Sequence, residues 1–339
     1  MNLTFDGDTI METLRVCLTP ILILAALVIS QPAHSQYWPQ KPVKIIVPFP
    51  PGGNTDGIAR IIAERLGEAL GQQFVVENRA GASGTLAAEN VARAPADGYM
   101  LLMASPSQIA IAPAMTKTPY DPVKDFAPIS IIGSNPLVLV VHPSMPVRTV
   151  AKFVEYVRKQ PVKLAYAAAG VGSIVHLSTA MFLHRAGLEM IPVTYKGGAP
   201  ALTDVIAGHV PVYFPNLSEA LPHATSGVLR LLAVSSETRV SQLPDLPTLS
   251  ESGYPGFKAV TWNGLMAPAG TPGEVIERIA KEVARAIAEP RLAERIAGFG
   301  VTPLGSSPEQ FAATIAADTA LWAEAVKIAG VQETGVQEK

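Results

Sequence analysis

The sequence predicts an α/β fold with two lobes. Short apolar runs typical of strands alternate with stretches of helical periodicity through most of the chain. Two strand-like stretches, 129–141 and 260–266, contain the polar breaks expected where a chain crosses between lobes. About 300 residues follow the N-terminal apolar segment, more than one core usually accommodates. We therefore expect lobe 1 to comprise 36–134 with 260–339 and lobe 2 to comprise 135–259, each a parallel sheet flanked by helices, with a ligand cleft between them.

The first 35 residues are typical of a secretory signal peptide. An apolar run from Leu14 to Ile29 is short for a membrane span, and Ala33-His34-Ser35 after it is a small-residue cleavage pattern. We expect cleavage after Ser35; the alternative is an uncleaved anchor. The acidic residues before the apolar run leave Met11 open as an alternative start. Cleavage removes Cys17, the only cysteine, so the mature chain has no thiol chemistry.

The charge of the mature chain is balanced. The whole chain has 26 basic and 28 acidic residues, and the loss of Arg15, Asp6, Asp8 and Glu12 leaves 25 of each. A neutral protein has no electrostatic footprint for nucleic acid or an anionic membrane surface. We therefore expect neither as a partner.

Lobe 1 begins with repeated strand–loop–helix units. The strand 44–47 leads through a loop of prolines and glycines into an amphipathic helix that Gly71 ends. A second strand at 74–76, a glycine-containing turn at 78–84, a helix to about Arg93 and a strand at 101–104 follow. The stretch 129–141 then carries the chain into lobe 2.

Lobe 2 repeats this alternation before the chain returns. Its expected strands are 163–167, 191–194, 210–214 and 229–234. After the second crossing, Thr271-Pro272-Gly273-Glu274 and Ser307-Pro308-Glu309-Gln310 both have the pattern of a capping box with Pro at the first helical position. Two amphipathic helices should therefore end the chain.

Three glycine-rich loops join strands to helices and are the candidate ligand contacts. The loop 48–56 has two glycines that let the backbone approach a ligand, and the first turn of the next helix favours an anion. The loops 170–173 and 195–200 repeat this arrangement in lobe 2. The third glycine of a dinucleotide-binding motif is absent, since Val175 stands there, so we expect no such cofactor. For Lys196 we weigh two roles equally, a solvated side chain and an anion ligand. For Asp204 a structural role is favoured over contact with the cleft.

Few residues suit catalysis or metal binding. Asp56 and His176 are the only titratable side chains that we can place in the cleft, so an enzyme is less favoured than a solute-binding protein. His176 and His184, eight residues apart, make a poor metal pair, and we expect no metal and no cofactor. Trp262, beside the second crossing, is either a wall of the cleft or a buried tryptophan between the lobes.

Six motifs, in this order, resemble the Bug-type solute-binding receptors of tripartite tricarboxylate transporters. They are Lys41 to Asp56, Asn78 to Gly84, Gly172-Ser173 with His176-Leu177, Tyr195 to Ala201, Leu243 to Thr248, and Ala267 to Pro272. The resemblance covers essentially the whole mature chain. It implies a periplasmic protein of the type II periplasmic-binding-protein fold, with a small carboxylate held largely by backbone amides and waters.

The resemblance also implies a set of ligand-binding residues. Carried onto this chain and joined with the residues argued above, they are Phe49, Pro51, Gly52, Gly53, Asn54, Asp56, Ser105, Ser107, Gly170, Gly172, Ser173, His176, Lys196, Gly197, Asp204 and Trp262. Pro106 and Ala168-Ala169 depart from the common pattern and leave the identity of the carboxylate open. The expected partners are the membrane components of a tripartite transporter, the alternative being a sensor kinase, and the protein is expected to be a monomer.

Overall fold

The structure is a computed structural model that describes residues 38–224 and 226–331. Residues Lys41–Lys339 form one compact unit, and all of the sheets and helices below belong to it. The predicted signal peptide, its cleavage after Ser35 and Cys17 lie outside the described residues.

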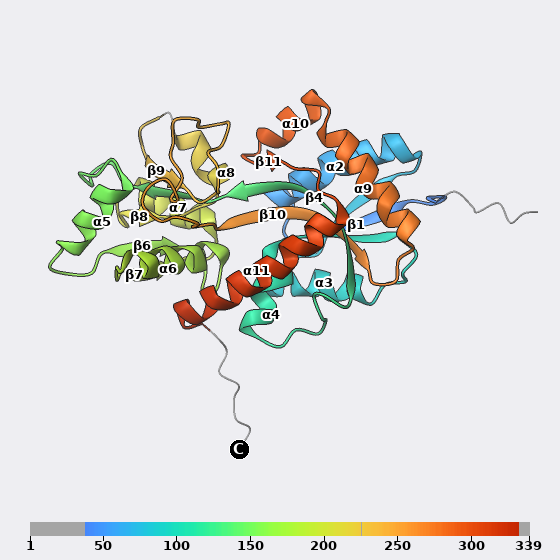
Figure 1. Ribbon diagram of the computed structural model, residues 1–339, viewed down its shortest axis with the longest axis horizontal. Coiled ribbons are helices and arrows are strands. Elements are labelled where there is room, and N and C mark those ends of the chain that lie inside the picture. The colour runs from blue at the N-terminus through green and yellow to red at the C-terminus, as the bar shows by residue number, and fades with distance from the viewer. Residues whose placement is uncertain (1–37, 225, 332–339) are drawn as a thin grey trace, which may run out of the picture. The chain divides into compact units, whose positions relative to one another are not determined.

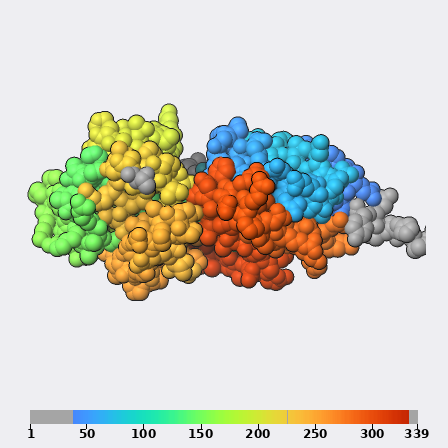
Figure 2. All heavy atoms as spheres, turned by 90° about the horizontal axis from the view of Figure 1, so that it is seen from above, coloured from blue at the N-terminus to red at the C-terminus, as the bar shows by residue number. Residues whose placement is uncertain are grey.

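The first sheet gathers strands from both ends of the compact unit (Figure 1). Its order is β11-β4-β10-β3-β1-β2. The strands are β1 (Val43–Val47), β2 (Phe74–Asn78), β3 (Met100–Ala104), β4 (Phe126–Pro136), β10 (Val260–Pro268) and β11 (Thr302–Pro303). The space-filling view likewise places the blue early segments beside the red late ones, with the green to yellow middle of the chain on the other side (Figure 2).

The second sheet is built from the middle of the chain alone, in the order β7-β6-β8-β5-β9. Its strands are β5 (Val138–Val141), β6 (Ala165–Ala168), β7 (Ile191–Thr194), β8 (Val212–Tyr213) and β9 (Arg230–Val234). Two sheets flanked by helices confirm the predicted α/β class. The exact lobe boundaries at 134/135 and 259/260 stay predictions.

Both sheets are mixed, which corrects the expectation of parallel sheets. β1 pairs in parallel with β2 and β3, but β10 runs antiparallel to β3 and to β4. β4 leads the chain toward the second sheet and β10 brings it back, so two neighbouring strands must run in opposite directions. In the second sheet β6 is parallel to β7 and β8, and β5 is antiparallel to β8 and β9.

The helices follow the strands much as the periodicity indicates. Around the first sheet they are α2 (Asn54–Leu70), α3 (Thr85–Ala92), α4 (Ala112–Met115), α9 (Gly273–Ile287), α10 (Pro290–Ala297) and α11 (Pro308–Ala329). Around the second they are α5 (Val150–Arg158), α6 (Ile174–Ala186), α7 (Gly198–Ile206) and α8 (Leu217–Ala220). Two short 3-10 helices are η1 (Ala82–Gly84) and η3 (Leu221–His223), and η2 (Ser107–Ile111) is a short π-helix. No helix in the described part of the chain combines the length and apolarity needed to cross a bilayer.

One of the two predicted capping boxes is present. The Ser307 hydroxyl accepts from the N–H of Gln310 at 3.2 Å, and Gln310 Oε1 accepts from the N–H of Ser307 at 2.9 Å, so α11 begins as predicted. The box at Thr271 is wrong. Pro272 occupies the N-cap of α9, and Thr271, one residue too early, donates its hydroxyl to the Pro268 carbonyl at 2.8 Å.

The helix α11 takes part in both hydrophobic cores. Phe311 and Ile315 pack in the core under the first sheet, with Trp262 and Ile131 among their neighbours. Eleven residues after Phe311, Trp322 belongs to the core of the second sheet, together with Ala325 and Val326. A single helix of 22 residues therefore ties the two cores together.

Candidate functional site

A cavity of about 260 Å³ lies where elements of the two sheets meet. Residues from the β1–α2 loop, from the end of β3, from β4, from β10, and from the loops after β6 and β8 surround it. They are Phe49, Gly53, Asn54, Thr55, Ser105, Pro106, Ser107, Asn135, Ile174, Asn216, Thr261, Trp262 and Asn263. A larger cavity, of about 540 Å³, opens among elements of the second sheet only and contains none of the predicted site residues.

The β1–α2 loop is held in shape by Asp56. Gly52 has a left-handed backbone with φ of 85°, and its N–H donates to Asp56 Oδ2 at 2.9 Å. Arg60 donates to both carboxylate oxygens at 3.0 Å, and Asn78 Nδ2 bridges Asp56 Oδ1 at 2.9 Å and the Phe49 carbonyl at 3.0 Å. Burial would raise the pKa of Asp56, but these hydrogen bonds outweigh it and hold the pKa at about 2. Asp56 is ionised, buried and turned into its own loop, so it does not line the cavity.

The same loop presents the start of α2 to the cavity. Gly53 is the N-cap, and no side chain caps the helix, so the first N–H groups of its 17 residues stay available at the cavity wall. Asn54 is held at both ends of its amide: Nδ2 donates to the Phe299 carbonyl, and Oδ1 accepts from Asn263 Nδ2, each at 3.0 Å. Of the other predicted loop residues, Phe49 lines the cavity, whereas Pro51 and Gly52 do not.

The end of β3 contributes two serines. Ser105 is buried, and its N–H and hydroxyl both donate to Gln108 Oε1, at 3.0 and 2.9 Å. Ser107, at the start of η2, also lines the cavity. The predicted pair therefore lies beside the N-terminus of α2.

The polar groups of the loop before α6 form hydrogen bonds with one another and with the first turn of that helix. Ser173 accepts from the N–H of His176 at 3.2 Å and donates to the Gly170 carbonyl at 2.8 Å. Gly172, left-handed with φ of 69°, donates its N–H to His176 Nδ1 at 3.2 Å. The ring nitrogen is an acceptor in this contact, and burial lowers the pKa of His176, so the imidazole is neutral. From this loop and the start of α6, only Ile174 lines the cavity.

The residues of the third predicted loop lie elsewhere. Lys196 is exposed, and neither Lys196 nor Gly197 lines the cavity. Asp204 Oδ2 accepts from the Tyr195 hydroxyl at 2.8 Å, and Oδ1 lies 3.3 Å from His209 Nδ1. Asp204 thus stabilises the loop in front of α7.

Trp262 is both buried and part of the cavity wall. It is 2% exposed, and its indole N–H donates to Asp318 Oδ2 at 2.7 Å. Burial raises the pKa of Asp318, against the opposing effect of that hydrogen bond. Trp262 thus lines the cavity and is buried, but it packs in the core under the first sheet, with its N–H held by Asp318. Its predicted role as a ligand contact stays a prediction.

Sequence reasoning missed a set of neutral polar side chains. Asn135 and Asn263 are only 2% and 3% exposed and come from the crossing strands, Asn216 follows β8, and Thr55 and Thr261 complete the set. Asn216 Nδ2 donates to Glu219 Oε1 at 3.2 Å, while its Oδ1 is buried without a hydrogen-bond partner among the described residues. An asparagine inside an apolar strand, as at 135 and 263, was the available signal.

None of the described side chains that line this cavity is ionisable near neutral pH. Within residues 38–224 and 226–331, no group of three or more His, Cys, Asp or Glu side chains could hold a metal ion. The cavity is suited to reversible binding through neutral donors and acceptors, and its lining offers neither a nucleophile with a base nor a pair of acids.

Comparison with known proteins decides the family. A model described as "Tripartite tricarboxylate transporter family receptor" matches residues 58–331. The chain belongs to this receptor family. A family of transporter receptors, one solved relative of which is described as a periplasmic binding protein, confirms the predicted resemblance and the expectation that the protein is not an enzyme.

The matches between this chain and its relatives extend over nearly the whole length of the relatives. Protein BugT of Bordetella pertussis is 36% identical over 92% of this chain and 96% of its own. The structure of R. palustris Rpa4515 with adipate is 38% identical with a TM-score of 0.76, over 86% of this chain and 98% of that one. The structure of periplasmic binding protein BugD is 36% identical with a TM-score of 0.73, over 87% and 99%.

Proposed function

We propose that this chain captures a small carboxylate in the 260 Å³ cavity and delivers it to the membrane components of a tripartite tricarboxylate-type transporter. We further propose that residues 1–35 export it and that the mature periplasmic chain begins at Gln36. The observation that carries the proposal is the uncapped N-terminus of α2 at the wall of a cavity without charged side chains.

Recognition of the carboxylate follows from that geometry. The first N–H groups of α2, with the helix dipole behind them, offer several donors to one anionic group. A hydrogen bond to a charged group contributes about 1.5–3 kcal/mol, so two or three such bonds suffice without a lysine or arginine. The neutral amides of Asn135, Asn216 and Asn263 surround the rest of the ligand.

The relative with adipate supports the same ligand class. Adipate is a small carboxylate, and the chain shares 38% identity with that protein over almost its full length. The absence of a cation from the lining is consistent with recognition by backbone amides and ordered water.

The variant Gly53→Val tests the proposal. Gly53 lines the cavity and has an ordinary φ of −81°, and the nearest atom to an added Cβ is the Pro50 carbonyl oxygen at 3.8 Å, so a Cβ fits without a clash. In calorimetric titration of the mature chain with a carboxylate selected from a thermal-shift panel that includes adipate, we expect Gly53→Val to weaken binding at least about tenfold.

The matched control is Gly273→Val. Gly273 is the first residue of α9, an added Cβ there meets nothing within 4 Å, and it is not part of the cavity. It should bind like the wild type. If Gly53→Val stays folded and binds like the control, or if no carboxylate of the panel binds, the proposal fails.

A further inference from the structure

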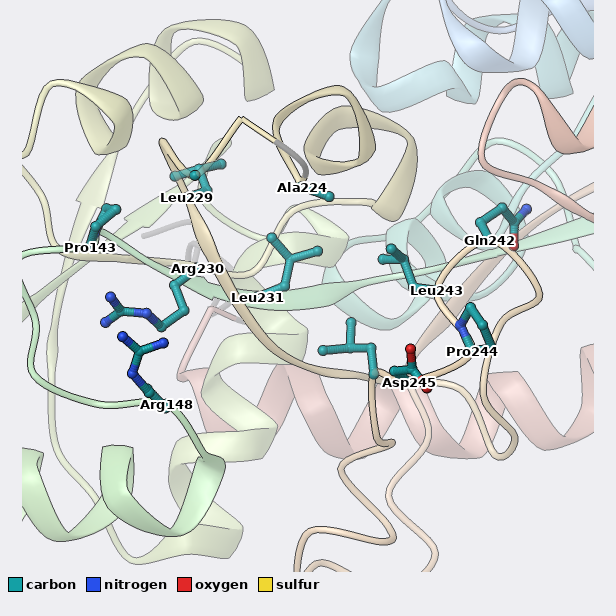
Figure 3. Close-up of a pocket in the computed structure, with 12 residues that line it drawn as sticks. Pro143, Arg148, Ala224, Leu229, Arg230, Leu231, Gln242, Leu243, Pro244 and Asp245 are labelled. Carbon is teal, nitrogen blue, oxygen red and sulfur yellow. The ribbon is translucent and has the colours of Figure 1, made fainter.

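The larger cavity described above, about 540 Å³, is lined by β9 and by loops of the same middle part of the chain, residues 143–246. It opens beside the edge strand β9, between the turn that precedes α5 and the loop 242–246, which contains part of the Leu243 to Thr248 motif (Figure 3). None of the residues that line the 260 Å³ cavity also lines the 540 Å³ cavity. A ligand of the larger cavity would therefore be bound in addition to the carboxylate proposed for the 260 Å³ cavity.

Two arginines lie at one end of this cavity. Arg230 Nη1 donates to the carbonyls of Met145 and Val147, at 2.6 and 2.9 Å, which fixes its guanidinium. Arg148 lies next to it in the same wall, and Figure 3 shows both head groups at the same end. None of the ion pairs among the described residues includes either arginine. Two adjacent positive charges without a carboxylate favour an anion from solution.

The rest of the lining is mostly apolar. Leu231 and Leu243 lie between the arginines and the far end, and Leu229 lies above Arg230 in the view (Figure 3). Gln242 lies at the far end (Figure 3). The lining thus joins a cationic end to an apolar body, which is a usual composition of a small-molecule site.

Asp245 decides which kind of anion fits. It lines the same cavity at the end away from the arginines (Figure 3). A second carboxylate on the ligand would meet its like charge there, so a molecule with one charged end and an apolar body is favoured.

We propose that this cavity is a second binding site, for a monocarboxylate with an apolar body, in which Arg148 and Arg230 bind the carboxylate and the leucines contact the hydrocarbon. The site is independent of the carboxylate capture proposed for the cleft. Octanoate is a suitable probe because it has one charge and an apolar chain.

Calorimetric titration of the mature chain with octanoate tests the site. We expect saturable binding that Arg148→Gln weakens about tenfold, the loss that follows from one charge-assisted hydrogen bond. Arg148 is exposed, so its replacement should leave the fold intact, as circular dichroism will check. The control Arg93→Gln removes an exposed arginine of the first lobe, outside the cavity, and should not change the affinity.

Titrations with other ligands and with a second variant distinguish this site from uncharged binding and from binding in the 260 Å³ cavity. Octanamide, which lacks the charge, and adipate, which has two, should both bind this cavity at least about tenfold more weakly than octanoate. Octanoate binding should persist in Gly53→Val, because Gly53 lines the 260 Å³ cavity and not this one. The proposal is wrong if octanoate does not bind saturably, if octanamide binds equally well, if Arg148→Gln has no effect, or if Gly53→Val abolishes octanoate binding.

Discussion

At the residue scale, Asp56 is the strongest local determinant of the β1–α2 loop. Its carboxylate accepts hydrogen bonds from Gly52, Arg60 and Asn78, and the exposed fraction of the residue is 4%. Because its pKa in the folded state, about 2, lies below the ordinary value of 3.8, the ionised form stabilises the fold. This contribution is fully present above the ordinary value and is lost as the pH falls toward 2.

We expect Asp56→Asn to lower the free energy of unfolding at pH 7 by about 1–3 kcal/mol, because the variant keeps the shape but loses the charged acceptor. The difference from the wild type should shrink as the pH is lowered from 5 toward 2. Urea unfolding at several pH values measures both effects. Glu68→Gln, on the exposed face of the same helix, is the control and should change stability by less than about 0.5 kcal/mol at every pH. A constant difference across the series would contradict the assignment.

For the candidate site, the sequence predicts which loops lie near the cavity but not which partners their side chains bind. Glycine loops after strands were predictable because the chemistry of close backbone approach is local, and Gly53 does line the cavity. Asp56 and Ser173 were proposed as ligand contacts on the same local grounds, yet their oxygens are used by Arg60 and by the Gly170 turn, partners that only the folded backbone brings near. The ligand roles themselves stay predictions.

At the element scale, helix ends determine where the chain offers donors. α2 starts without a side-chain cap, α6 is capped by Ser173, and α11 by Ser307. The pattern of strands and helices was predictable from apolar periodicity, whereas the antiparallel neighbours β4 and β10 were not, because pairing between residues so far apart is set by the path of the whole chain. The failure at Thr271 has a similar cause: a one-residue shift of the helix start leaves the same motif without its function.

We expect Ser307→Ala to destabilise the protein by about 1 kcal/mol, since it removes the acceptor for the N–H of Gln310 at the first turn of α11. Ser307→Thr should recover most of the loss, because threonine supplies the same oxygen. Urea unfolding followed by circular dichroism compares the three proteins. Equal losses in both variants would mean that the hydroxyl does not act as the cap.

At the scale of the whole molecule, α11 makes the two sheets depend on each other. Phe311 is fully buried with its ring 5.0 Å from that of Trp262, in the core of the first sheet. Trp322 is equally buried in the core of the second. The two strands β4 and β10 could by themselves act as flexible crossings, but a continuous helix that contributes to both cores couples their unfolding.

Two variants test this coupling, each of which removes the aromatic side chain of α11 from one of the two cores. Phe311→Ala and Trp322→Ala should each cost about 3–5 kcal/mol, as expected for the loss of a large buried aromatic side chain. Each should also raise hydrogen exchange in both sheets to a similar extent, because opening of one core releases the helix from the other. Mass spectrometry of exchange in peptides from β1 and β3, and from β5 and β8, measures the two sheets separately. If Phe311→Ala affects only the first sheet and Trp322→Ala only the second, the lobes unfold independently and α11 does not couple them. A response in both sheets means that α11 couples them. The rigidity of the 260 Å³ cavity is then set by a helix that contains none of the residues lining it.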